Sequence, residues 1–86
     1  MGNVAVTFRI MPDEAGTDLE AMKTRVRKAL GTAFRDLREE EVAFGLKAVV
    51  AIAVVSDAAG GTDRLEQSLG AVPGVGSVET VDVTLV

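Results

Sequence analysis

The side chains best able to do chemistry in this chain are its carboxylates and a few serines, because the 86 residues contain neither histidine nor cysteine. Without histidine, the usual general base for a serine nucleophile is missing. Disulfides and thiolate metal sites are excluded as well. Ser56, Ser68 and Ser77 are therefore poor candidates for covalent catalysis, and we expect neither bond-making chemistry nor a cofactor.

Four carboxylates lie close together in the sequence, at Asp36, Glu39, Glu40 and Glu41. Carboxylate oxygens bind hard cations, but these residues lack the glycine-containing loop that folds carboxylates around calcium. Charged residues are also common on edge strands, where they discourage pairing with other chains. The pattern therefore favours a solvated strand edge over a metal site.

The net charge and its distribution indicate which kind of partner the protein could bind. The formal net charge is -4, with an isoelectric point near 4.6, and the basic residues are spread along the chain. Nucleic-acid binding normally requires clustered lysine and arginine, so we expect a protein or a small ligand instead. No apolar run approaches the ~18 residues of a membrane span. We expect a soluble, cytoplasmic protein.

The segment Ala43-Phe44-Gly45-Leu46-Lys47 is the most informative part of the chain. It contains one of only three aromatic residues, follows the acidic run, and leads directly into an apolar stretch. The glycine permits a bend or a close approach of another backbone. The aromatic side chain could be ordinary core or an exposed partner contact, and Lys47 could be simply solvated. The residues alone leave these alternatives open.

Four strands are predicted from hydropathy. Alternation from Val4 to Ile10 indicates a strand with one face on a core, ended by Met11-Pro12. The uncharged, β-branched run within Leu46–Val55 is typical of a central strand. Ala33–Val42 is irregular and charged, which suits an edge, and Val75–Val86 alternates again.

Two helices are predicted between these strands. Thr17 and Glu20 have the spacing of a capping box, so a helix should start near Thr17 and end at Gly31. Gly60-Gly61-Thr62 is typical of a turn, and Thr62 or Asp63 should cap the second helix. An anion bound at that helix start is the less favoured alternative. The apolar stripes of the two helices comprise Leu19, Met22, Val26, Ala29 and Leu30, and Leu65, Leu69 and Val72.

The element order β-α-β-β-α-β predicts an α+β, ferredoxin-like fold, in which two helices cover one face of a four-stranded antiparallel sheet. The first and third strands should lie in the middle. The open face would then expose an apolar strip that a second copy could cover. This gives an alternative function, a regulatory module binding a small ligand at a sheet-paired dimer interface. The strip would consist of Ala5, Val49, Ala51, Ala53 and Val55.

Several motifs in order resemble archaeal-type elongation factor 1-beta over the whole chain. The block that continues the 43–47 segment into Ala48 is the most specific of them. The others are Met1-Gly2, Met11-Pro12, Asp18-Leu19-Glu20, Gly60-Gly61-Thr62, Gly74-Val75 and Val81-Asp82-Val83.

The resemblance implies a single guanine-nucleotide exchange domain over residues 1–86. Its partner would be elongation factor 1-alpha, the GTPase that delivers aminoacyl-tRNA. We expect no direct binding of nucleic acid, and a monomer is favoured although the sequence does not determine the oligomeric state. By analogy the partner-binding residues are Ala43, Phe44, Gly45, Leu46 and Lys47, with Phe44 as the main contact. Eukaryotic members also use a basic residue near the chain end, whereas this chain ends in Val83-Thr84-Leu85-Val86.

Overall fold

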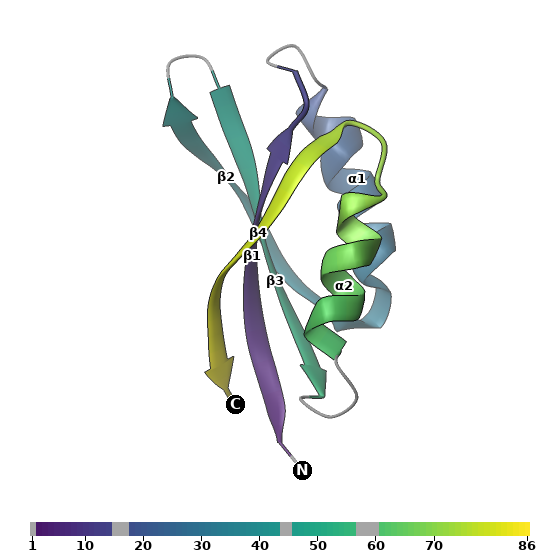
Figure 1. Cartoon of the computed structure of the whole chain (residues 1–86), viewed down its shortest axis with the longest axis vertical. Helices are drawn as coiled ribbons and strands as arrows, with labels where there is room; N and C mark the ends of the chain where they lie inside the picture. The colour runs from purple at the N-terminus through teal and green to yellow at the C-terminus, as the bar shows by residue number, and fades with distance from the viewer. Residues whose placement is uncertain (1, 15–17, 44–45, 57–60) are drawn as a thin grey trace.

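The computed structural model describes residues 2–14, 18–43, 46–56 and 61–86. Four strands form one antiparallel sheet in the order β2-β3-β1-β4, and both helices pack on the same face of it (Figure 1). The predicted α+β, ferredoxin-like architecture is therefore confirmed, including the central position of the first and third strands. The elements are β1 (Asn3–Pro12), α1 (Leu19–Leu30), a 3-10 turn (Gly31–Ala33), β2 (Phe34–Ala43), β3 (Leu46–Ser56), α2 (Gly61–Gly70) and β4 (Val75–Leu85).

The core lies between the sheet and the two helices. Every second residue of β1 is buried, as its alternation predicts, and these side chains meet the apolar stripe of α1 and Leu69 of α2. Among the described residues, neither helix has the length and apolar run that a membrane crossing needs. The core residues of β1 and α1 are Val4, Val6, Phe8, Ile10, Met22, Val26 and Leu30.

The predicted apolar strip on the open face is wrong for β3. Val49, Ala51 and Ala53 lie opposite Ile10, Phe8 and Val6 in the register of β1 and β3, so they face the helices and belong to the core. Val55 packs against the same core, and only Ala5 of the predicted set lies on the other face. The error arose because both faces of this strand are apolar, so its sequence carries no alternation that identifies the core side. The β3 residues on the open face are Ala48, Val50, Ile52 and Val54.

Helix α1 begins one residue later than the capping-box prediction. Asp18 is the N-cap, and its Oδ1 accepts hydrogen bonds from the backbone N–H groups of Glu20 and Ala21 at 3.0 and 3.3 Å. A carboxylate suits this position because it also complements the positive end of the helix dipole. Thr17 lies outside the described residues. Gly31, at φ 56°, ends the helix as predicted.

Helix α2 begins earlier than predicted, because Thr62 and Asp63 already lie within its first turn rather than at the cap. A Cβ atom on Gly61 would lie 2.9 Å from the carbonyl oxygen of Ser56, so glycine allows the helix to start against the end of β3. Leu69 is buried and Leu65 half-buried, as the predicted stripe requires. Val72 lies beyond the end of the helix.

Candidate functional site

The β2–β3 pair extends to one end of an elongated molecule. The pairing closes on Ala43 and Leu46, and the principal extents of the protein are 41 × 20 × 17 Å. In Figure 1 the end of β2 and the start of β3 lie at the top, whereas the start of β1 and the end of β4 lie at the bottom. The end of β2 at Ala43 and the start of β3 at Leu46 and Lys47 therefore lie at one tip of the molecule, which we call the β2–β3 tip.

The structure places only part of the predicted contact segment. Ala43 is the last residue of β2, and Leu46 and Lys47 begin β3. Leu46 is half-buried and Lys47 exposed. Phe44 and Gly45 lie outside the described residues, so the expectation that this aromatic side chain contacts a partner stays a prediction.

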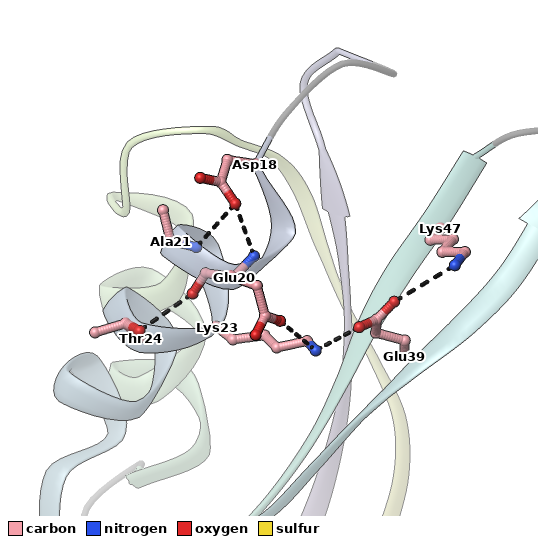
Figure 2. Close-up of polar contacts among 7 residues, drawn as sticks. All are labelled: Asp18, Glu20, Ala21, Lys23, Thr24, Glu39 and Lys47. Atoms are coloured by element: carbon pink, nitrogen blue, oxygen red, sulfur yellow. Dashed lines mark hydrogen bonds and ion pairs between the residues drawn. The ribbon is translucent and has the colours of Figure 1, made fainter.

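Lys47 is one end of a chain of alternating charges on the helix side of the sheet (Figure 2). Its Nζ lies 3.7 Å from Oε1 of Glu39, and Oε2 of Glu39 accepts a hydrogen bond from Nζ of Lys23. The same lysine donates to Glu20 Oε2 at 2.7 Å. Helix α1, β2 and β3 each contribute to this chain. We call Glu20, Lys23, Glu39 and Lys47 the charge chain.

Lys23 and Glu39, the two inner residues of the charge chain, each stabilise the charged form of the other. Hydrogen bonds to Glu20 and then Glu39 raise the pKa of Lys23 above its ordinary value of 10.5. The hydrogen bond from Lys23 lowers the pKa of Glu39 below its ordinary value of 4.5, and the charge of Lys47 acts in the same direction. Each shift arises because the hydrogen bond or nearby opposite charge stabilises the charged form. The contacts of Lys23 and Glu39 therefore stabilise the charged forms of these two residues.

The next carboxylate along β2 points to the opposite face. Glu40 Oε1 lies 3.1 Å from Nη2 of Arg9, and Nη1 of Arg9 lies 3.1 Å from Glu79 Oε1 on β4. Glu39 and Glu40 are thus separated by the sheet itself. These two neighbouring carboxylates therefore do not converge on one point. Among the described residues, no group of three or more metal-ligating side chains is found.

Arg9 is a site residue that the sequence reasoning missed. In the register, Arg9 lies opposite Val50 of β3, so its side chain must pass over β3 to reach Glu40 on β2. This explains why Ala48 and Val50 are buried, at 0 and 2% exposure, on a face that carries no helix. Arg9 is the one charged residue within β1, and a single arginine on the open face of a central strand could have indicated this role.

A shallow groove lies beside Arg9 on the open face, near the β2–β3 tip. Its volume is about 480 Å³. It combines apolar side chains with the ion pair between Arg9 and Glu79, so the open face here is mixed in character rather than apolar. The lining residues are Arg9, Met11, Val42, Ser77, Val78 and Glu79.

Comparison with known proteins identifies the family to which this chain belongs. The model of the EF-1 guanine nucleotide exchange domain matches residues 5–86, and the chain belongs to this family of guanine-nucleotide exchange domains. Elongation factor 1-beta from Methanoregula boonei is 46% identical over 99% of both chains. The proteins of that name from Methanoculleus marisnigri and Methanothermobacter thermautotrophicus are 45 and 41% identical, covering 100 and 96% of both chains. The predicted family and its nucleotide-exchange role in translation elongation are confirmed.

Proposed function

We propose that the protein promotes release of GDP from elongation factor 1-alpha so that GTP can rebind, and that residues 1–86 act as one exchange domain in the cytoplasm. The family match over almost the whole chain is the observation that carries this proposal. The exchange role needs no bond chemistry from the protein itself. This fits a chain without histidine or cysteine.

The mechanism follows from linkage between two binding equilibria. If the exchange factor binds the empty GTPase more tightly than the GDP-bound form, it must weaken GDP binding by the same factor. GDP is held by a magnesium ion and by backbone N–H groups around its phosphates. A small, rigid domain that displaces this cradle therefore accelerates release without touching a covalent bond.

The contact with the GTPase is assigned to Ala43, Phe44, Gly45, Leu46 and Lys47 at the β2–β3 tip. Two features support this assignment. The tip lies at an extremity of the molecule, and Lys47 exposes about half of its side chain there. A projecting tip can enter a concave site on a partner more readily than the broad face of a sheet.

Release of a fluorescent GDP analogue tests the proposed function. Elongation factor 1-alpha from a methanogen is loaded with the analogue, excess unlabelled nucleotide is added, and release is followed with substoichiometric amounts of this protein. We expect accelerated release with many turnovers per molecule. An active GTPase whose release rate is unchanged would contradict the proposal.

The alternative, a small-ligand module at a sheet-paired dimer interface, loses its main support. Three of the five residues in its apolar strip lie in the core, and a fourth packs against it. Ion pairs from Arg9 to Glu40 and Glu79 cross the open face instead.

A further inference from the structure

From Lys23 toward the β2–β3 tip, the side chains of the charge chain become more exposed, whereas Glu20 at its other end is 81% exposed. The side chain of Lys23 is 20% exposed, that of Glu39 34% and that of Lys47 52%. Lys23 makes close hydrogen bonds to both of its carboxylate partners, whereas the ion pair between Lys47 and Glu39 spans 3.7 Å. Beyond hydrogen-bond distance, such a half-exposed pair contributes little energy.

Glu39 can release Lys47 without becoming unpaired. Its other carboxylate oxygen keeps the hydrogen bond from Lys23, which in turn keeps its bond to Glu20. Breaking a buried pair is costly when it leaves a charge alone, but no charge is left alone here. The ammonium group of Lys47 can therefore exchange one carboxylate for another at little cost.

We propose that the ammonium group of Lys47 moves from Glu39 to a carboxylate side chain of the GTPase on docking, and that Glu39 is the positioning residue that holds this group until then. This inference rests on the proposed exchange function. Figure 2 shows the ammonium group of Lys47 directed toward Glu39 on the neighbouring strand. Glu39 thus limits the rotamers that must be ordered on binding.

The acceptor is a carboxylate of the GTPase and not a phosphate of the nucleotide. An exchange factor must prefer the empty GTPase to the GDP-bound one. A bond from Lys47 to GDP would stabilise the bound form and oppose release. A bond to a side chain of the GTPase persists after GDP has left, so it favours the exchange complex.

The test measures GDP release against concentration of the exchange factor, which separates half-saturating concentration from maximal rate. We expect Lys47→Ala to raise the half-saturating concentration about twofold to fivefold, Lys47→Glu to raise it further, and Lys47→Arg to stay near wild type. The maximal rate should change little. Added salt should weaken wild type more than Lys47→Ala.

Positioning by Glu39 is tested by a double-variant cycle. We expect Glu39→Gln alone to raise the half-saturating concentration about twofold and to have no further effect in the Lys47→Ala background. Lys28→Ala removes an exposed lysine in the last turn of α1 and serves as the charge-matched control. If Glu39→Gln acts equally in both backgrounds, Glu39 does not act through Lys47.

Two further outcomes would overturn the inference while leaving the exchange function standing. The first is accelerated release by wild type with an unchanged half-saturating concentration for Lys47→Ala and Lys47→Glu. The second is a Lys47→Ala defect in binding to the GDP-bound GTPase that is absent with the nucleotide-free GTPase. If wild type itself gives no acceleration, the proposed function fails first.

Discussion

The guanidinium of Arg9 on β1 and the carboxylate of Glu40 on β2 form an ion pair of 3.1 Å across β3, the strand that lies between them. A second pair of the same length joins Arg9 to Glu79 on β4. One side chain therefore links the two edge strands of the sheet from its centre. Its Nε is buried and has no hydrogen-bond partner among the described residues.

Arg9 should stabilise the fold more by its aliphatic stem than by its charge. The stem covers apolar residues of β3, whereas half-exposed ion pairs contribute little and the unpaired Nε is unfavourable. We expect Arg9→Ala to reduce the free energy of unfolding by about 1–2 kcal/mol and Arg9→Met by less than half as much. Urea denaturation measures both. Equal losses in the two variants would assign the stabilisation to the ion pairs instead.

Replacing Phe44 by alanine should abolish most exchange activity while changing stability little, because we assign this side chain to the partner and not to the core. Truncating a buried phenylalanine costs about 3–5 kcal/mol. Phe8, which is fully buried, provides the matched control, and Phe8→Ala should show that full loss. Melting temperature and GDP release are measured together. A fall in melting temperature for Phe44→Ala as steep as that for Phe8→Ala would refute the contact assignment.

The contribution of Glu39 to stability should depend on pH at both ends of the scale. Because the pKa of Glu39 is lowered in the folded state, its carboxylate stabilises the fold fully above pH 4.5. This stabilisation is lost as the pH falls through the folded-state pKa. Because the pKa of Lys23 is raised in the folded state, its ammonium group stabilises the fold fully below pH 10.5. This stabilisation is lost as the pH rises through the folded-state pKa. The stability difference between wild type and Glu39→Gln should therefore be largest between these limits.

Chemical denaturation of both proteins across the pH range measures this difference. Most other titrating groups are common to both proteins, so their effects largely cancel. A difference that stays constant from acid to alkaline pH would show that the ion pairs of Glu39 contribute nothing.

The N-cap of α1 gives a further prediction. Asp18→Ala should reduce the free energy of unfolding by about 1 kcal/mol, because two backbone N–H groups lose their acceptor. Asp18→Asn keeps an oxygen acceptor and should retain most of that stability. Thermal denaturation of the two variants distinguishes them. A loss for the asparagine variant as large as for alanine would indicate that charge, rather than the hydrogen bonds, carries the effect.

The fold could be predicted from the sequence where the hydrophobic periodicity agrees with the residues that begin or end a helix or strand. Alternation in β1 identified its core face correctly, and the stripe of α1 ending at Gly31 matched the structure. The core face of β3 could not be predicted, because alanine, valine and isoleucine occupy both of its faces. The start of α1 was misplaced by one residue and that of α2 by two or three, since neighbouring residues at each start are acceptable caps locally.

The candidate site was predictable only in outline. Composition and motifs drew attention to the segment from Ala43 to Lys47, but its contacts depend on strand register. Glu39 meets Lys23 because the register of β2 against β3 turns this carboxylate toward α1. Glu40 meets Arg9 because the pairings of β2 with β3 and of β3 with β1 place both side chains on the same face of β3. Register of this kind results from the whole sheet and leaves no local trace in the sequence.

The position of the β2–β3 tip, opposite the start of β1 and the end of β4, has a practical consequence. A surface linker or fluorescent label joined at either end of the chain would lie at the far side of a molecule 41 Å long. Immobilised protein would then present the tip toward solution. Single-molecule measurements of GTPase encounters could therefore use terminal attachment without obstructing the residues under study.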